Sequence, residues 1–474
     1  MSEPKVEENT TQEEKKDSVE NISEKLEASA IGTESTNPQN TQDKEAEESA
    51  SADASLLKKL LRSRLEEDNS AIEVERQNPD SPLYSCKRFE DLNLKQELLQ
   101  GLYAMGFTKP SKIQETALPN LLSNPPQNLI AQSQSGTGKT AAFSLAMLSR
   151  IDTNLLYPQA LCLAPTMELA AQITDVVRQM GQYMKNLKIA SAIRGNMVPR
   201  NVELKEQVII GTPGTVFDWS SPRINAFSLK KLRVFVLDEA DVMIDQQGHQ
   251  DICIRIVRGL PKDCQIMLFS ATYKNPVIEF AKKIVGNPII IRLKRSQESL
   301  SYIKQFYVRC ESFETKYRAL TNIFGLLTVG QSIIFCQTRK TARDVVVRLT
   351  EDGVPCELLS GELDVMQRAA VIKRFREGKC KMLITTNVTA RGIDVDDVNL
   401  VINFDLPIGQ DGHPEFETYL HRIGRTGRFG KFGVAINFVD TNTMGALDQI
   451  LKHFGRPIDK LDASDPEQIE KITQ

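Results

Sequence analysis

A glycine-rich segment, SQSGTGKT, has the residue types of a phosphate-binding loop. It follows an apolar run and precedes a helical pattern, and the N-terminus of a helix favours bound phosphate. In such a loop the glycines let backbone N–H groups surround phosphate oxygens, the lysine reaches the β- and γ-phosphates, and the last hydroxyl binds Mg²⁺. Because a serine replaces the first glycine of the usual G-x-x-x-x-G-K-[ST] pattern, a glycine-rich turn without a ligand is the alternative. The predicted ATP-binding residues here are Ser133, Gln134, Ser135, Gly136, Thr137, Gly138, Lys139 and Thr140.

An acidic quartet, DEAD at residues 238–241, begins 99 residues after Lys139 and directly follows the apolar run RVFVL. Taken alone, such a quartet is more often a solvated surface. At the end of a buried strand and downstream of a phosphate-binding loop, Asp238 suits an Mg²⁺-associated carboxylate, and Glu239 can orient or deprotonate the attacking water. Lys139, Asp238 and Glu239 are therefore candidate catalytic residues, and Thr140 and Asp238 are candidate metal ligands.

The composition separates an acidic tail from a mildly basic body. Residues 1–54 carry 15 Asp and Glu against 5 Lys and Arg, a net charge of −10, and the first aromatic residue is Tyr84. Since such a segment cannot bury enough apolar surface to offset its ordering entropy, we expect residues 1–85 to be a disordered tail. The whole chain has a charge of −3, so the remaining 420 residues carry +7, which suits a polyanionic partner.

A short amphipathic helix is expected near residues 55–66, where SLLKKLLRSR places four leucines on one stripe and the basic residues largely on the other. The helix could dock on its own body or form only transiently; it could also wedge near a cleft and suppress activity, or serve as a basic arm that binds a polyanion.

Several classes of protein are excluded. The eight cysteines are scattered without a C-x-x-C pair, which indicates reduced residues of a cytosolic or nuclear protein. No run approaches 18 apolar residues and the N-terminus is acidic, so we expect no membrane insertion and no signal peptide.

Short apolar runs rich in Val and Ile alternate with helical patterns from residue 86 onward, as in strands buried on both faces of a parallel sheet. They form two sets, separated by the polar segment 294–301. The sequence predicts an α/β fold with two tandem doubly wound domains, residues 86–295 and 302–474. The predicted strands are 128–133, 160–164, 207–211, 233–237 and 265–269 in the first domain, and 332–336, 354–359, 381–384, 399–404 and 433–438 in the second.

Polar clusters follow the carboxyl ends of these strands: SQSGTGKT, PTMEL, TPGT, DEAD, SAT, QTRK, SGE and TTNVTARGID. In open α/β sheets, ligands bind outside the carboxyl ends of the strands. The pattern therefore predicts a ligand site along one edge of each sheet.

Taken together and in this order, the motifs resemble those of DEAD-box RNA helicases. The resemblance covers residues 86 to about 440 and rests on Gly106-Phe107…Pro110…Ile113-Gln114, the phosphate-binding loop, PTMELA, TPGT, DEAD, SAT at 270–272, ARGID at 390–394 and HRIGRTGR at 421–428. It implies two RecA-like domains, ATP with Mg²⁺, and an RNA-stimulated ATPase that is an ATP-dependent RNA helicase.

The resemblance also implies roles for single residues in ATP binding. The amide of Gln114 would pair with adenine, in the two-pronged way in which Gln reads adenine in DNA. Phe107, or alternatively Phe89, would stack on the base. Gly392 would allow close backbone approach to the phosphates, and Asp394 would accept a hydrogen bond from the ribose.

Catalysis would require both domains. Arg425 and Arg428, from the second domain, would stabilise the charge of the transition state only on closure. Ser270, Thr272, Asp241 and His421 would couple the halves, although His421 could instead be a packing residue.

RNA contacts would come from small or polar groups at strand ends, which favours binding to phosphates and 2′-hydroxyls over reading of sequence. The implied residues are Pro165, Thr166, Gly195, Thr212, Pro213, Gly214, Gly361, Gln367 and Thr386. Kinking one strand on closure would separate a duplex locally.

Some positions depart from the family pattern: Met167 replaces the usual Arg of PTRELA, and Arg194-Gly195-Asn196, Thr215 and Thr386-Asn387 are also unusual. Met167 puts the coupling to RNA or ATP in doubt.

Together with the insertion GQDGHPEF, such features resemble the nuclear-pore mRNA-export subgroup of the family. This resemblance implies a monomer that binds single-stranded RNA without sequence preference and acts on mRNP proteins. It also implies the cytoplasmic face of the pore as location, and a nucleoporin, an export cofactor and inositol hexakisphosphate as partners. A general translation or ribosome-assembly helicase and an ATP-locked RNA clamp remain alternatives.

Overall fold

The structure is a computed structural model that describes residues 72–75, 85–132, 137–245, 249–272, 275–293, 302–327, 330–386, 398–427 and 432–472. Several predictions fall outside these residues: the helix near 55–66, Ser133, Gln134, Ser135, Gly136, Gly392, Asp394 and Arg428.

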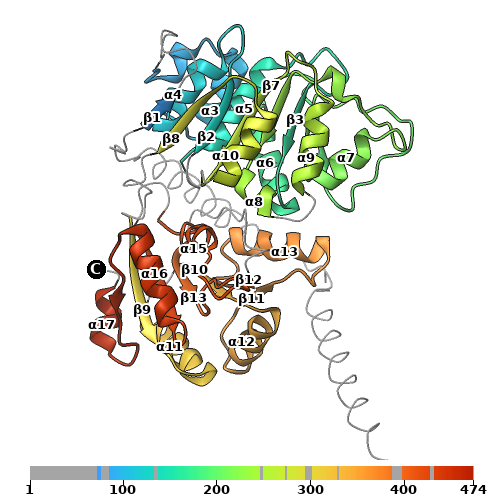
Figure 1. Ribbon diagram of the computed structural model, residues 1–474. Coiled ribbons are helices and arrows are strands. Elements are labelled where there is room, and N and C mark those ends of the chain that lie inside the picture. The colour runs from blue at the N-terminus through green and yellow to red at the C-terminus, as the bar shows by residue number, and fades with distance from the viewer. Residues whose placement is uncertain are drawn as a thin grey trace, which may run out of the picture. The chain divides into compact units, whose positions relative to one another are not determined.

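The first sheet has eight strands in the order β1-β8-β2-β7-β6-β3-β5-β4, parallel except for β1, which pairs antiparallel with β8 (Figure 1). Its strands are β1 (Ile72–Glu75), β2 (Asn128–Gln132), β3 (Ala160–Leu163), β4 (Ile189–Ala192), β5 (Val208–Gly211), β6 (Val234–Leu237), β7 (Gln265–Ser270) and β8 (Pro288–Leu293). Strand β1 lies within residues 1–85, the segment expected to be a tail.

Helices cover both faces of this sheet because its strands are apolar on both sides. Along β3, Ala160 and Cys162 pack in one core cluster while Leu161 and Leu163 pack in another. The first cluster contains residues of α3 (Gln96–Ala104), α4 (Lys112–Leu121), α5 (Lys139–Arg150) and α6 (Met167–Met180), and the second contains residues of α7 (Pro213–Ser220), α8 (Ala240–Asp245), α9 (His249–Arg258) and α10 (Asn275–Ile284). Two short 3₁₀ helices, η1 (Phe89–Leu92) and η2 (Leu229–Lys231), complete this part.

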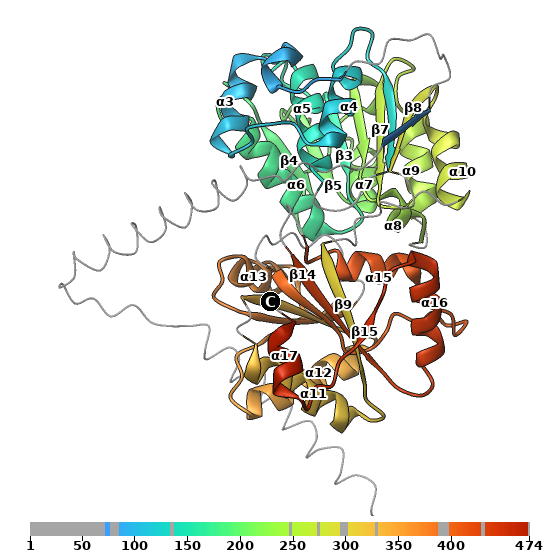
Figure 2. The ribbon, with the colours of Figure 1, turned by 90° about the vertical axis from the view of Figure 1, so that its left-hand side faces the viewer.

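The second sheet has seven parallel strands in the order β11-β12-β10-β13-β14-β9-β15. They are β9 (Ile303–Arg309), β10 (Gln331–Cys336), β11 (Glu357–Leu359), β12 (Met382–Thr386), β13 (Val398–Asn403), β14 (Gly433–Val439) and β15 (Asp459–Lys460). Figure 2 shows α13 (Val365–Arg376), α15 (Phe416–Ile423) and α16 (Met444–Phe454) on one face, and α11 (Phe313–Leu326), α12 (Arg339–Glu351) and α17 (Pro466–Lys471) on the other.

The predicted fold class, two tandem α/β domains with parallel sheets, is confirmed. All ten predicted strands are present, with ends that differ by up to three residues. The sequence analysis missed β1, β4, β8, β9 and β15. Strand β9 lies near the edge of its sheet and alternates between buried and exposed residues, so it lacks the continuous apolar run by which the other strands were found.

All eight cysteines are free thiols and all but Cys356 are buried, which agrees with their expected role in the core. Within the part of the chain that the structure describes, no helix has the length and apolar character needed to cross a membrane.

Candidate active site

The described end of the phosphate-binding loop is shaped by Gly138, whose φ of 96° lies in the left-handed region that favours glycine. A Cβ at this position would lie 2.5 Å from Gln114 Nε2, so a larger residue would be strained in the backbone and would displace the Gln114 amide. Gly138 caps the N-terminus of α5, and Lys139 and Thr140 are its first residues. The sequence therefore places both predicted phosphate and metal contacts on the first turn of a helix.

Gln114 is buried, and both polar atoms of its amide form hydrogen bonds that hold the loop. Its Oε1 accepts a hydrogen bond from the Ser111 backbone N–H at 2.8 Å, and its Nε2 donates to the Gly138 carbonyl at 3.0 Å. Ser111 Oγ donates to the Thr137 carbonyl at 2.7 Å. These bonds leave a second N–H on Nε2 and a second lone pair on Oε1, the two groups with which Gln114 is predicted to pair with adenine.

The two candidates for stacking on the base differ in accessibility. Phe107 is half-buried at the edge of the first core cluster, whereas Phe89 is completely buried within it. Only Phe107 therefore keeps an accessible ring.

Asp238 follows the last residue of β6 and is buried, accepting a hydrogen bond from the Glu239 N–H at 3.0 Å. Burial, followed by the neighbouring charge of Glu239, raises the pKa of Asp238 to about 7. A nearby cation would favour its ionised form, and Lys139 already acts in this direction.

Glu239, the second residue of the acidic motif, contacts the lysine of the phosphate-binding loop. Its Oε1 is 3.7 Å from Lys139 Nζ, and both side chains are largely buried. Its backbone φ of 50° is unusual for a residue other than glycine, and strain of this kind, about 1–3 kcal/mol, concentrates at functional sites. The chain therefore stores strain at the residue predicted to act on the attacking water.

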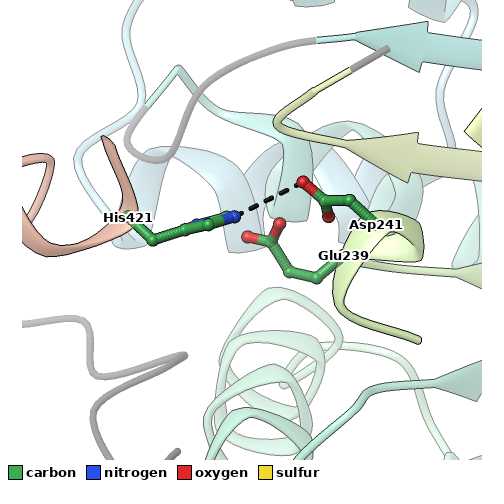
Figure 3. A group of neighbouring side chains, drawn as sticks. All are labelled: Glu239, Asp241 and His421. Carbon is green, nitrogen blue, oxygen red and sulfur yellow. Dashed lines mark hydrogen bonds and ion pairs between the residues drawn. The ribbon is translucent and has the colours of Figure 1, made fainter. Parts of the chain in front are cut away.

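Asp241 joins the first domain to the second. It accepts a hydrogen bond from Thr272 Oγ1 at 3.0 Å, and its Oδ2 lies 3.4 Å from His421 Nε2 (Figure 3). Burial alone would raise the pKa of Asp241, but the hydrogen bond and charge of His421, then Lys139 and Thr272, hold it well below its usual range. Three of the four predicted coupling residues thus meet at one carboxylate, and the fourth, Ser270, is buried at the end of β7.

Arg425 lies next to this contact and is buried. Its Nε donates to the His421 carbonyl at 2.8 Å, so the position of the guanidinium depends on the position of His421.

Two groups of residues could hold a cation. Glu239, Asp241 and His421 have ligand atoms within 4.8 Å of one another (Figure 3), but the ammonium of Lys139 beside Glu239 opposes a cation there. Asp238 and Thr140 offer the carboxylate and hydroxyl oxygens that Mg²⁺ prefers.

The predicted RNA-binding residues gather at the carboxyl ends of neighbouring strands. In the first sheet, Pro165 and Thr166 follow β3, Gly195 follows β4, and residues 212–214 follow β5. In the second sheet, Gly361 follows β11 and Thr386 ends β12, while Gln367 caps the first turn of α13. Gly195 has a φ of 98° and open space around its Cα. The nine residues thus form two rows, one at the carboxyl ends of the strands of each sheet.

Glu168 and Arg368 were not predicted from the sequence, although they connect the two domains. Arg368 Nε, on α13, lies 3.2 Å from Glu168 Oε1, on α6, and Arg368 Nη2 donates to Met167 Sδ at 3.0 Å. Met167, which replaces the usual arginine, thus accepts a hydrogen bond from a cation of the other domain. The proximity of Glu168 to a strand end was the only available signal, because its partner is 200 residues away.

Reversing the charge at Arg368 is expected to weaken domain closure. The variant Arg368→Glu would bring two carboxylates together and should lower RNA-stimulated ATPase activity about tenfold, and adding Glu168→Arg should restore part of the loss. Steady-state ATPase assays of the two single variants and the double variant measure this coupling.

A matched control is available on the same helix, because Arg374 pairs with Glu357 of its own domain at 2.7 Å. The pair Arg374→Glu and Glu357→Arg should leave the RNA-stimulated activity unchanged. Additive losses at positions 168 and 368 would contradict the proposed coupling.

The chain has two RecA-like sheets, and the predicted site residues lie at the carboxyl ends of their strands. The acidic motif of the first domain contacts a histidine of the second. These features define a two-domain nucleotide hydrolase of the helicase type. The chain belongs to the DEAD/DEAH box helicase family, since that family model matches residues 111–280 and the helicase conserved C-terminal domain matches residues 315–430.

Similar proteins agree with this assignment. The chain is 56% identical over 449 residues to the human ATP-dependent RNA helicase DDX19A, a match that covers 94% of this chain and 93% of the relative. It is also similar to the structure of S. cerevisiae Dbp5 bound to RNA and ADP BeF3, with 49% identity, a TM-score of 0.77, and coverage of 82% of this chain and 98% of that one. A Dbp5 variant bound to Nup159, Gle1, IP6 and ADP matches with 47% identity, a TM-score of 0.61, and coverage of 80% and 98%.

Proposed function

We propose that this chain is an RNA-stimulated ATPase, an ATP-dependent RNA helicase that remodels RNA–protein complexes during mRNA export through the nuclear pore. The observation that carries the proposal is the contact of Asp241 with Thr272 and His421, beside the Lys139–Glu239 pair. It links the acidic motif of one domain to the second domain, so that hydrolysis depends on closure. The resemblance to nuclear-pore helicases and the similarity to DDX19A and Dbp5 support the biological context.

The residues of the site divide the work of hydrolysis. Lys139 holds the β- and γ-phosphates, and Glu239 orients or deprotonates the attacking water. Arg425 stabilises the charge that develops in the transition state. Because Arg425 is held by the His421 carbonyl and His421 meets Asp241, the guanidinium reaches its place only when the domains close.

Mg²⁺ fits the oxygen ligands of this site. Asp238 is buried and its pKa is raised to about 7, because its ionised form is poorly solvated there. A bound divalent cation would stabilise the ionised carboxylate, and the Thr140 hydroxyl is the other proposed ligand. When bound with ATP, the ion would neutralise phosphate charge.

RNA is held by the two rows of small and polar groups at the strand ends. Such groups contact phosphates and 2′-hydroxyls rather than base edges, so we expect little preference for sequence. Binding one kinked strand across both domains would displace its partner locally.

The proposed partners follow from the relatives. The Dbp5 variant was bound to Nup159, Gle1 and IP6, and we propose a nucleoporin, an export cofactor and inositol hexakisphosphate as partners of this chain, which would act as a monomer at the cytoplasmic face of the pore.

Steady-state ATPase activity with and without single-stranded RNA tests the proposal. We expect turnover to rise at least tenfold with RNA, because closure assembles the site. Turnover that is low and unaffected by RNA would indicate an ATP-locked clamp, and localisation away from the pore would indicate a general translation or ribosome-assembly helicase.

A further inference from the structure

We infer that Asn403 and Asn437, two buried asparagines outside the sequence motifs of the active site, are positioning residues for ATP hydrolysis. With Tyr419, Arg422 and Gln305 they form a polar chain that sets the register of helix α15, and thereby the places of His421 and Arg425. The inference rests on the proposed function of His421 and Arg425 in ATP hydrolysis.

The chain of hydrogen bonds crosses the second sheet. Arg422 Nη1 donates to Asn403 Oδ1 at 2.9 Å, and Asn403 Nδ2 donates to Asn437 Oδ1 at 2.8 Å. Asn437 Nδ2 donates to the Tyr419 hydroxyl at 3.1 Å, and this hydroxyl donates to Gln305 Oε1 at 2.7 Å. The chain thus leaves α15 at Arg422, runs across strands β13 and β14 on the face that α15 covers, and returns to α15 at Tyr419.

These groups are deeply buried. Asn403, Asn437 and Tyr419 have no exposed surface, and Arg422 is 2% exposed. A buried polar group costs about 1–3 kcal/mol when it loses its partner. Any sliding of α15 along the sheet would break bonds at both ends of the chain and would leave such groups unsatisfied.

The orientation of each amide is fixed by its neighbours. Asn437 Nδ2 also donates to the Phe306 carbonyl at 3.1 Å, so its oxygen must face Asn403. Asn403 and Asn437 stand opposite each other on the adjacent parallel strands β13 and β14. Since the strands hold both amides, the sheet presents a rigid template to which only one position of α15 fits.

The helix transmits this position to the active site. Tyr419 and Arg422 are three residues apart and therefore lie on one face of α15. His421 is the neighbour of Arg422, and its carbonyl holds Arg425 Nε at 2.8 Å. A displacement of α15 would therefore move His421 away from Asp241 and would also move Arg425.

Stability alone does not explain buried polar residues here, since other positions on the same face of these strands are apolar. Val401, two residues before Asn403, and Ala435 and Val439, two residues before and after Asn437, are buried in the core clusters of this face. Buried polar networks contribute specificity of arrangement more reliably than stability. The second domain needs this specificity in α15, which carries His421 and ends two residues before Arg425.

The test compares two network variants with two matched controls in the full-length protein. Tyr419→Phe removes one hydroxyl, and Asn437→Leu interrupts the chain at its centre. The control Tyr317→Phe removes a hydroxyl that bonds to Asp352 Oδ2 at 2.5 Å, and Asn322→Leu removes an amide that bonds to the Ala463 carbonyl at 3.0 Å. Both controls lie in the second domain, on α11.

We expect kcat with saturating RNA to fall about threefold in Tyr419→Phe and about tenfold in Asn437→Leu, with unchanged KM for ATP. The controls should keep the wild-type kcat even if they lower the unfolding temperature. Equal kcat in network and control variants, or a raised KM at unchanged kcat, would overturn the inference. If Asn437→Leu does not fold, the comparison of kcat between Tyr419→Phe and Tyr317→Phe tests the inference: equal values would overturn it.

A second readout follows His421 directly. The chain has four histidines, so ¹⁵N-histidine NMR of the complex with RNA and ADP–beryllium fluoride can follow the His421 ring. The network variants should shift its Nε2 resonance and the controls should not; an unchanged resonance in both would contradict the positioning role. Absence of RNA stimulation in the wild type would instead refute the proposed function.

Discussion

Replacing Glu239 by glutamine is expected to lower kcat for ATP hydrolysis by about 10²–10⁴-fold, the usual contribution of a general base. Glutamine keeps the shape of the side chain and can adopt the same backbone, including the φ of 50°, but it cannot take a proton from water. Because the phosphate-binding residues are unchanged, ATP and RNA should still bind. The variant should therefore accumulate as a stable complex with both ligands.

Single-turnover hydrolysis and the dissociation rate of labelled RNA measure these two effects separately. A matched control is Glu357→Gln, since Glu357 pairs with Arg374 away from the acidic motif. Wild-type turnover in Glu239→Gln would remove this residue from the catalytic role. Loss of ATP binding would show instead that the carboxylate serves mainly to hold Lys139, from which it is 3.7 Å away.

Replacing Arg425 by alanine is expected to lower kcat about 10³-fold or more, the scale known for arginine fingers, with little change in ATP affinity. The guanidinium comes from the second domain, so it acts on phosphate charge only after closure. Lysine should not restore activity, because a point charge lacks the planar fork of donors. Arg428 lies outside the described residues, and the same experiment applies to it.

Lys139→Ala provides the contrast, because its side chain belongs to the phosphate-binding loop of the first domain. This variant should lose nucleotide-dependent function through weaker binding, whereas Arg425→Ala should lose it through kcat. Nucleotide titrations combined with steady-state kinetics distinguish the two. Normal hydrolysis by Arg425→Ala with saturating RNA would show that the assignment of this arginine is wrong.

Much of the fold follows from local patterns in the sequence. Runs such as VFVL at 234–237 and IIFC at 333–336 are apolar on every residue, and only a strand covered on both faces can bury them in this way. The polar clusters directly after these runs then had to lie at the carboxyl ends of parallel strands. The same reasoning predicts that Lys139, Asp238 and Glu239 lie at one edge of the first sheet, and the structure places them there.

Other strands have a weaker hydrophobic pattern in the sequence. Strand β9 alternates because it lies near an edge, β15 has two residues, and β1 joins the first sheet from within a segment whose composition predicted a tail. Whether such a segment pairs depends on a free strand edge elsewhere in the chain, here that of β8.

The sequence by itself determined the class of fold and the edge of each sheet at which the predicted ligand-binding residues gather, because periodicity and burial are local properties of a strand or helix. Only the tertiary structure decided the partners of buried polar groups: Glu168 with Arg368, Gln114 with the carbonyl of Gly138, and Asn403 with Asn437. These pairs depend on which elements become neighbours in the fold. The sequence around one residue does not indicate which distant residue will contact it. A buried amide must find a partner, but its own sequence surroundings do not say which one.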